Sequence, residues 1–187
     1  MVVDDLWFLA DEASQRAEQA YHRLCEQYSN YLDEHRTRRV SRRRFRTLAS
    51  RVKQTGAPWG AHTIVYRDTD ELLLVRHDGV DLWVLPGGEV REDETYREAA
   101  IRELGEEAGV SADYRGLAIA NRIDICCDDY ETWGVMPVFF AAAEDVDLHV
   151  DDPDDEISDA GWFSFSDLPA DTRDRGDLLA WRDHASL

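Results

Sequence analysis

GEVREDETYREAAIRELGEEAGV, residues 88–110, is the stretch that decides the fold of this chain. Within it, Glu103, Glu106 and Glu107 stand at i, i+3 and i+4, so an α-helix places their side chains on one face. Carboxylates gathered at one spot repel one another unless a cation neutralises them. Hard divalent cations take oxygen ligands of this kind. The spacing therefore predicts a helix that carries a site for Mg²⁺ or Mn²⁺.

Local signals predict where this helix begins and ends. Thr95 followed by Glu98 is a capping-box pattern, which favours a helix start, and Gly109 can take the left-handed conformation that ends a helix. The apolar stripe expected to pack on a sheet consists of Ala100, Ile101, Leu104 and Ala108. Gly87 and Gly88 lie just before the stretch, and they allow the backbone to approach a metal or a phosphate closely.

The complete pattern resembles the Nudix box. Gly88, five residues, Glu94, seven residues and then RELGEEAGV, residues 102–110, match every fixed position of that motif. A Glu-rich helix alone is usually only an exposed acidic helix, but so long a match favours the Nudix hydrolase superfamily. The resemblance covers about residues 60–168. It implies an α/β fold, the Nudix α/β/α sandwich with a mixed sheet.

The resemblance implies roles for individual residues. The metal ligands would be Glu103, Glu106 and Glu107, with the backbone carbonyl of Gly87 as a further ligand. Arg102 and Glu94 would be catalytic residues that orient these carboxylates.

The general base stays open between three residues. The candidates are Glu103, Glu107 and Glu156, which stands six residues before Trp162. Glu144 is the second candidate for the place of Glu156. The remaining aspartates of the stretch at residues 151–155 are interpreted as a solvated loop. Candidate substrate contacts are Arg76, Trp83 and Tyr130.

The implied activity is a metal-dependent pyrophosphohydrolase. It would cleave the diphosphate linkage of a nucleoside diphosphate derivative: a nucleotide, a nucleotide sugar or a dinucleoside polyphosphate. Ile125, Cys126 and Cys127 occupy the window where the ADP-ribose subfamily has a proline, and Tyr130 falls slightly beyond the tyrosine of the dinucleoside polyphosphate subfamily. The alternative is a non-catalytic module that senses nucleotides. Such modules typically lose box carboxylates, and all of them are present here.

Composition and charge predict the kind of organism and the cellular location of the protein. The net charge is −19, and it divides into +3 for residues 1–60 and −22 for residues 61–187. Lys53 is the single lysine. An acidic, lysine-poor surface predicts a protein of a halophilic archaeon, with an acidic protein of an ordinary high-GC genome as the alternative. No apolar run spans a membrane, and residues 1–5 lack the positive start of a signal peptide, so we expect a cytoplasmic protein.

The first 56 residues are predicted to form a helical extension to a Nudix domain at residues 57–187. Apolar residues recur at helical spacing between Asp4 and Leu32, and they are Leu6, Leu9, Ala13, Ala17, Ala20, Leu24, Tyr28 and Leu32. A second apolar set, Val40, Phe45, Leu48 and Val52, accompanies a possible cap at Ser41. Together they predict an α-helical hairpin that ends near Gly56. Its stripe must pack on the catalytic domain or on a second copy, so a homodimer through these helices is allowed.

Arginines concentrate between the two predicted helices. The set is Arg36, Arg38, Arg39, Arg42, Arg43, Arg44 and Arg46. It could bind an anion such as RNA or substrate phosphates, but a solvated face is the favoured interpretation. Only Phe45 interleaves with the arginines, so nothing indicates base stacking, and a nucleic-acid partner is not expected.

The rest of the chain shows strand patterns on both sides of the central helix. Residues 57–60 are predicted to be a linker, and strands are expected at residues 61–67, 71–77, 117–127, 135–142 and 162–165. The apolar run Leu72–Val75 is typical of a strand buried on both faces. A helix at residues 178–184 closes the chain. The three cysteines form no metal-ligand spacing and no disulfide framework.

Overall fold

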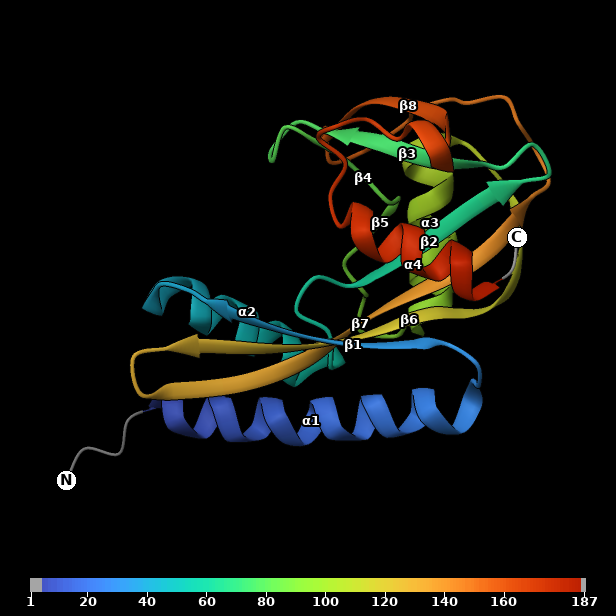
Figure 1. Ribbon diagram of the computed structural model, residues 1–187. Coiled ribbons are helices and arrows are strands. Elements are labelled where there is room, and N and C mark those ends of the chain that lie inside the picture. Colours follow the sequence, from blue (N-terminus) through green and yellow to red (C-terminus); the bar gives the residue numbers. More distant parts are fainter. Residues whose placement is uncertain (1–4, 186–187) are drawn as a thin grey trace.

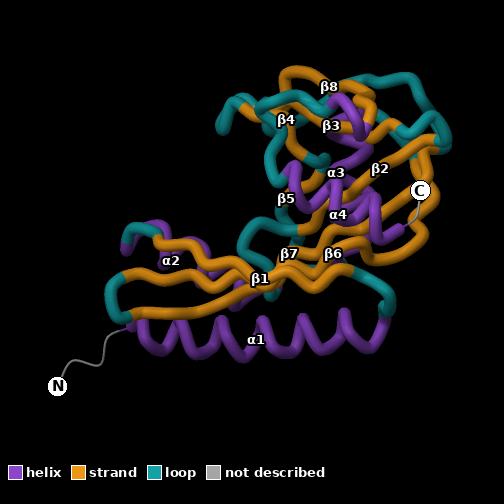
Figure 2. The backbone as a smooth tube through the Cα atoms, in the orientation of Figure 1, coloured by secondary structure: helices purple, strands orange, loops and turns teal. Residues whose placement is uncertain are grey.

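A single mixed sheet with helices on both faces makes up the molecule (Figures 1 and 2). The computed structural model describes residues 5–185. The strands follow one another across the sheet as β1 (Leu32–Arg39), β6 (Ala112–Cys127), β7 (Tyr130–Ala143), β2 (Ala61–Arg67), β3 (Glu71–His77) and β4 (Leu82–Val84). The short β5 (Gly87–Gly88) pairs with β2, and β8 (Ile157–Ser164) pairs with β3. The mixed sheet confirms the predicted α/β class.

Two helices cover opposite faces of the catalytic part. α3 (Tyr96–Ala108) packs through Leu104 on one face, and α4 (Arg175–Ala185) packs through Trp181 on the other. Neighbouring residues of a strand point to opposite faces. The run Leu72–Val75 therefore contributes to both clusters and is fully buried, as its sequence predicted.

The β6–β7 hairpin is longer than the sequence indicated. It projects beyond the catalytic part as an arm, and α1 (Asp5–Gln27) and α2 (Arg42–Thr55) lie beside it (Figure 1). A separate core cluster joins both helices to the arm, and it includes Ala13, Phe45, Leu48, Ile125 and Trp133. The N-terminal segment therefore contributes a core of its own to the shared sheet.

The prediction of a helical hairpin is wrong for the segment between the two helices, which contains a strand. α2 begins at the expected cap, Ser41, and ends at Gly56, but α1 ends at Gln27, before Tyr28 and Leu32. Residues 32–39 form β1, which pairs in parallel with residues 119–126 of β6. The segment LDEHRTRR offers no apolar stripe for a helix to bury, and its backbone satisfies its hydrogen bonds along the open edge of β6 instead. Charged side chains are tolerated on such an edge strand.

The predicted linker at residues 57–60 is a packed connection. Ala57, Pro58 and Gly60 are buried, and Val135 donates its backbone N–H to the carbonyl of Gly56. Gly60 has φ of 89°, and a Cβ built there would lie 1.7 Å from the carbonyl oxygen of Gly88. The end of the N-terminal segment is therefore packed directly against the glycine loop of the box.

Two further sequence expectations concern cysteines and membranes. Cys25, Cys126 and Cys127 are all free thiols. Within residues 5–185, no helix is both long enough and apolar enough to cross a membrane. The signal-peptide expectation rests on the first residues of the chain, and residues 1–4 lie outside the described part.

Candidate active site

The box helix begins and ends where its sequence indicated. Thr95 accepts a hydrogen bond from the backbone of Glu98, and the Glu98 carboxylate accepts one from the backbone of Thr95, which completes the capping box. Gly109 ends the helix with φ of 67°. The prediction for Ile101 is wrong, because its side chain is 46% exposed. Ile101 lies four residues from Arg97, on an exposed face of the helix, outside the buried arc.

The glycine loop packs against two of the box carboxylates. Gly87 donates its backbone N–H to Oε2 of Glu107 at 2.8 Å. Gly87 has φ of 148°, and a Cβ there would lie 2.4 Å from the carbonyl oxygen of Ala61. A Cβ on Gly88 would lie 2.7 Å from Cδ of Glu103. Gly87 must be glycine, because a Cβ there would meet backbone atoms, and a side chain at Gly88 would displace the Glu103 carboxylate.

Glu107 is a carboxyl group held in an unfavourable electrostatic environment. It is 7% exposed, and burial raises its pKa to about 8 against the opposing effect of the Gly87 N–H. The charges of Glu103, Asp152 and Glu156 raise this pKa further. Burial likewise raises the pKa of Glu103. The protein supplies too little positive charge to neutralise these buried carboxyl oxygens. A hard divalent cation would supply that charge.

Arg102 connects the carboxylates of the box. Its Nε lies 2.8 Å from Oε1 of Glu94, and its Nη1 lies 2.8 Å from Oε1 of Glu103 and 3.0 Å from Oε2 of Glu106. Its Nη2 donates to the carbonyl of Glu89 at 2.9 Å. These bonds raise the pKa of Arg102 and lower the pKa of Glu94. The guanidinium group is therefore held in one orientation by several partners.

The box carboxylates share a helix face but not a common point. Within residues 5–185, no three His, Cys, Asp or Glu side chains lie close enough together to hold a metal ion as they stand. Arg102 holds Glu103 and Glu106, while the glycine loop holds Glu107. The donor types nevertheless fit a hard divalent cation.

The acidic loop at residues 151–156 contains a residue that sequence reasoning missed. Oδ2 of Asp152 accepts the backbone N–H groups of Glu156 and Ile157, at 2.7 and 2.9 Å. Asp151 donates its N–H to the carbonyl of Glu106 at 3.1 Å, so the loop is attached to the box helix. Nothing in the run of acidic residues distinguishes Asp152 from its neighbours, because its role depends on how the loop folds back.

Glu156 and Glu144 differ in their relation to the box. Oε2 of Glu156 lies 3.6 Å from Nε2 of His77, and its charge is one of those that raise the pKa of Glu107. Glu144 is exposed after β7, where its backbone N–H donates to the carbonyl of Ser111. The structure therefore brings Glu156 into electrostatic contact with the box.

The three candidate substrate contacts do not all come together. Arg76 forms ion pairs with Asp81 and Asp171, and its guanidinium carbon lies 5.9 Å from the ring centroid of Trp83. Tyr130 instead begins β7 at the end of the arm, where its ring centroid lies 6.1 Å from that of Phe45. Figure 1 shows this end of the hairpin far from β4, which carries Trp83.

Three buried polar atoms near the glycine loop and the arm have no hydrogen-bond partner within the described chain. They are Nδ1 of His62, Oδ1 of Asn121 and Oγ1 of Thr172. His62 pairs with Gly87 across β2 and β5, and Thr172 forms an isolated bridge with Trp83. Burial lowers the pKa of His62 to about 4. Buried polar atoms are normally satisfied, so these positions are candidates for contact with a ligand.

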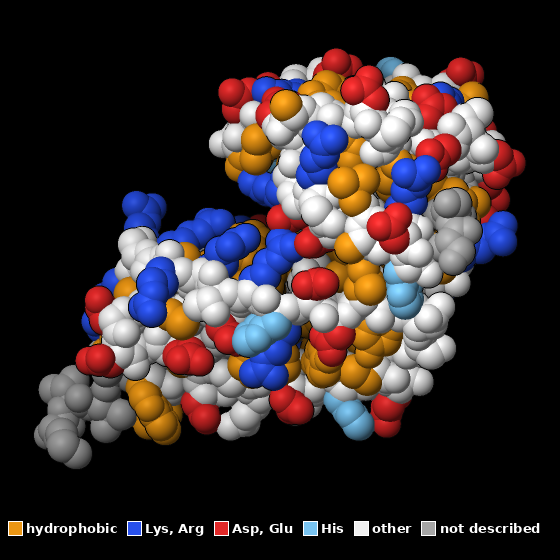
Figure 3. All heavy atoms as spheres, viewed as in Figure 1, with side chains coloured by type: hydrophobic (Ala, Val, Ile, Leu, Met, Phe, Trp, Pro, Cys, Tyr) orange, Lys and Arg blue, Asp and Glu red, His pale blue; other side chains and the backbone are white. Residues whose placement is uncertain are grey.

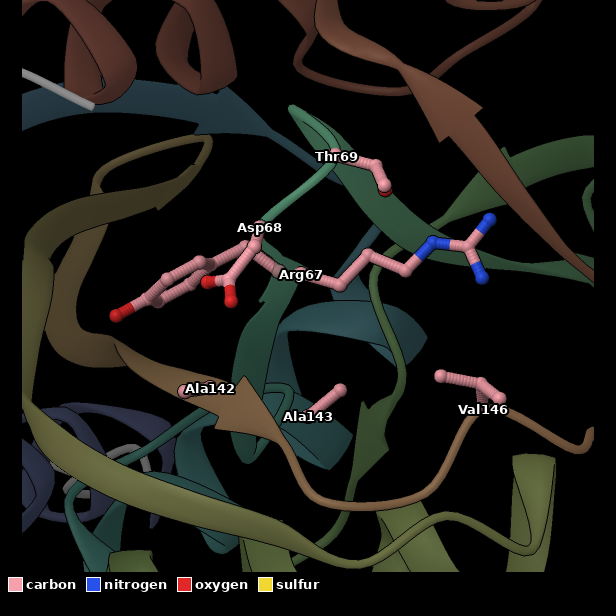
Figure 4. Close-up of a pocket in the computed structure, with 7 residues that line it drawn as sticks. Arg67, Asp68, Thr69, Ala142, Ala143 and Val146 are labelled. Carbon is pink, nitrogen blue, oxygen red and sulfur yellow. The ribbon is translucent and has the colours of Figure 1, made fainter.

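One cavity of the molecule lies apart from the box. It measures about 440 Å³ and is lined by Tyr66, Arg67, Asp68, Thr69, Ala142, Ala143 and Val146 (Figure 4). Its only basic lining residue, Arg67, is already paired with Glu71, with Nε 2.8 Å from Oε2. No box residue lines this cavity, and its charge is satisfied, so it is not the candidate active site.

Known proteins resemble this chain in sequence and in fold. A putative 8-oxo-dGTP diphosphatase of Bacillus subtilis (strain 168) is 47% identical over 53 residues, which are 28% of this chain and 36% of the relative. The match thus spans about a third of that relative's length. A hydrolase of the NUDIX family from Clostridium perfringens is 19% identical, covers 67% of this chain and 94% of its own, and has a TM-score of 0.52. The MutT protein of Methanosarcina mazei Go1 is 21% identical, covers 68% and 94%, and has a TM-score of 0.51.

The structural likenesses establish the fold, and the sequence match establishes the family. Residues 57–182 match the sequence model of the NUDIX domain, which is more than half of the chain. The matched domain model agrees with the Nudix assignment predicted from the sequence. The chain belongs to the NUDIX family.

Proposed function

We propose that this protein is a divalent-metal-dependent hydrolase that cleaves the diphosphate linkage of a nucleoside diphosphate derivative. The observation that carries the proposal is the burial of Glu107 against Gly87, with Glu103 packed on Gly88 beside it. Burying carboxyl groups near other carboxylates costs free energy unless a cation or a proton compensates. A helix with only a structural role gains nothing from this arrangement.

The proposed roles follow from the contacts. Glu103, Glu106, Glu107 and the carbonyl of Gly87 would hold Mg²⁺ or Mn²⁺, which supplies positive charge to the phosphates and activates water. Arg102 and Glu94 orient these carboxylates through their mutual ion pair. Glu103, Glu107 and Glu156 are the proposed candidates for the general base.

The nucleoside would bind on the side of β4. Trp83 is half-buried there, with Arg76 over its ring and Thr172, whose side-chain Oγ1 has no hydrogen-bond partner within the described chain, beside it. An aromatic face and unsatisfied polar atoms are the features that hold a base and a sugar. The name of the Bacillus subtilis relative, an 8-oxo-dGTP diphosphatase, makes nucleoside triphosphates the first class to test.

Composition and charge carry a proposal about where the protein works. The charge of −19 with a single lysine supports a cytoplasmic protein of a salt-loving organism. The extension at residues 1–56 and the Nudix domain at residues 57–187 remain the proposed division. A homodimer through the N-terminal helices also remains a proposal, but the stripe of α1 from Leu6 to Leu24 is already buried within one chain. Exposed Trp7 and Phe8 are the apolar residues of α1 left for such a contact.

The decisive experiment is hydrolysis of a nucleotide panel. Nucleoside triphosphates, ADP-ribose, nucleotide sugars and dinucleoside polyphosphates are incubated with the protein and Mg²⁺ or Mn²⁺, at low and at molar KCl, with EDTA as the control. We expect metal-dependent release of phosphate, pyrophosphate or a nucleoside monophosphate from at least one class. Saturable nucleotide binding without turnover of any compound would favour the alternative, a non-catalytic nucleotide-sensing module.

A further inference from the structure

A second cavity lies between the N-terminal segment and the box loop. It measures about 460 Å³, within the range of about 300–1,000 Å³ that small-molecule sites occupy. α1 and the end of α2 form one wall. The loop that precedes α3, together with the first residues of α3 up to Ile101, forms the other. None of the proposed metal ligands lines it, but Glu94, which binds Arg102, does, so the cavity adjoins the candidate active site without containing the proposed metal ligands.

The cavity gathers positive charge that the protein itself leaves uncompensated. Arg16, Arg23 and Arg97 line it, and within residues 5–185 none of them forms an ion pair with a carboxylate. Arg23 bonds only the carbonyl of Gln19, and the Arg97 guanidinium lies 5.7 Å from the ring centroid of Tyr114. In a chain with 40 acidic and 21 basic residues, cations without acidic partners in one cavity point to an anionic ligand.

The carboxylates of the cavity are mostly engaged elsewhere. Glu94 is paired with Arg102, and Glu98 is occupied by the helix cap. Within the described chain, Glu92 and Glu98 form no ion pair, so these two carboxylates stand against the three unpaired arginines. The free charge around the cavity is therefore positive.

The same cavity offers an apolar and aromatic surface. Ile101 projects from the box helix with 46% of its surface exposed, and Tyr28 lies with its ring centroid 5.8 Å from that of Phe139. Tyr96 is fixed by its hydroxyl, which donates to the carbonyl of Thr55 at 2.6 Å. Burial raises the pKa of Tyr96 to about 12, and the positive charges of Arg16 and Arg23 oppose that shift.

We propose that this cavity is a second binding site, which takes a phosphate-bearing ring compound of the nucleoside monophosphate class. Arg16, Arg23 and Arg97 bind the phosphate, and Tyr28 and Ile101 contact the ring. The binding claim rests on these residues alone and is independent of catalysis.

A ligand bound in the cavity could affect the box through a short series of contacts. The backbone N–H of Arg91 donates to Oε2 of Glu94 at 3.0 Å, and the Arg91 side chain lies 3.7 Å from Glu106. Glu94 in turn holds Arg102. A ligand that contacts this loop therefore acts on the residues that orient the carboxylates. This consequence rests on the proposed function, under which a nucleoside monophosphate is also a reaction product.

The test is calorimetric binding of AMP to the full-length protein in EDTA, where metal-dependent binding at the box is suppressed. We expect AMP to bind at one site per chain. Ribose 5-phosphate should bind more weakly than AMP, and inorganic phosphate more weakly than ribose 5-phosphate. Adenosine should show no binding. The double variant Arg16→Gln/Arg23→Gln should lose about tenfold or more in AMP affinity, because charge-assisted hydrogen bonds are removed. The matched control, Arg43→Gln/Arg44→Gln, removes two exposed arginines of α2 that do not line the cavity and should leave the affinity unchanged.

Two further variants separate this proposal from the proposed function. Ile101→Asp places a negative charge in the cavity at an exposed position, and it should abolish AMP binding while the melting temperature is retained. Glu107→Gln should retain AMP binding in EDTA although it loses hydrolysis. The proposal is overturned if AMP does not bind the wild-type protein at millimolar concentration. An AMP affinity that Arg16→Gln/Arg23→Gln and Ile101→Asp leave unchanged overturns it equally.

Discussion

The charged side chains of the box are paired with one another, whereas most arginines of the segment at residues 36–46 are not. In the box, Arg102 contacts three carboxylates and the carbonyl of Glu89. In the segment, Arg36 forms ion pairs with Asp174, which precedes α4, and with Asp177 within α4. Within the described chain, five arginines of the segment form no ion pair: Arg38, Arg39, Arg43, Arg44 and Arg46. Lys and Arg side chains gather along the side of α2 and β1 that faces the hollow below the catalytic part (Figure 3).

The difference follows from burial. Charges removed from water need specific partners, and those partners fix their geometry. Exposed arginines on an open helix face are solvated and need no such partners. The interpretation of the segment as a solvated face, and the alternative of an anion site, both remain predictions. In the box, in contrast, Arg102 and Glu107 are each held by specific partners within the chain.

The largest expected effect comes from removing residues 1–55. The deletion takes away β1 from the edge of β6 and exposes Ile125 and Trp133 of the arm. We expect an aggregated or unfolded product, measured by light scattering and thermal melting, with full-length Arg43→Gln/Arg44→Gln as a soluble control. A truncated protein as soluble and stable as the full chain would show that the arm needs no cover from the N-terminal segment.

Glu107→Gln should have the next largest effect. Loss of a proposed metal ligand should reduce kcat by on the order of 10²-fold or more while the fold survives. Glu98→Gln on the same helix is the matched control, since Glu98 serves the cap, and it should retain turnover. Steady-state hydrolysis of the best substrate from the panel measures both. Near-normal turnover in Glu107→Gln would remove the box helix from the mechanism.

Arg102→Lys tests whether activity requires the several hydrogen bonds of the guanidinium group or only its positive charge. A lysine cannot hold Glu94, Glu103 and Glu106 in the planar arrangement that a guanidinium group provides. We expect a fall of about tenfold in kcat and a higher Mg²⁺ requirement, since residues that orient metal ligands contribute about 10–100-fold. A Mg²⁺ titration of the rate measures it. An unchanged titration curve would mean that the positive charge alone suffices.

Salt should stabilise the acidic part more than the N-terminal segment. Residues 61–187 carry −22, and their mutual repulsion is screened over about 3 Å at molar salt. We expect the melting temperature and the activity to rise as KCl approaches roughly molar concentration. Calorimetric scans across a KCl series measure the effect, with sucrose as a control for excluded solute. A melting temperature independent of KCl would contradict the proposed adaptation to high salt.

The smallest expected effect is the acid response of the helix cap. Hydrogen bonds from the backbone and the hydroxyl of Thr95 lower the pKa of Glu98 below its ordinary 4.5. A lowered folded-state pKa means that this stabilisation is present at neutral pH and is lost as the pH falls through the folded-state value. The difference in melting temperature between wild type and Glu98→Gln should therefore shrink from pH 7 toward pH 3. A constant difference would show that the carboxylate charge does not contribute to the cap.

Much of the site was predictable because its signals are local or periodic. The capping box, the terminal Gly109 and the carboxylate spacing each involve residues within one or two helical turns. Ile101 was predicted wrongly because apolar character alone does not show which arc of a helix faces the sheet. Asp152 could not be found because its bonds depend on how its own loop folds back, and His62 could not be found because the strand paired with it comes from the glycine loop.

The sequence by itself determined the box helix, the glycine loop and the family, since these depend on residues close together in the chain. Only the tertiary structure decided that residues 32–39 form a strand, because their partner is residues 119–126 of β6. The structure likewise decided that Tyr130 belongs to the arm and that Arg16 and Arg23 meet the box loop across a cavity. In each case the free energy comes from contacts between distant segments, and local propensity carries no information about them.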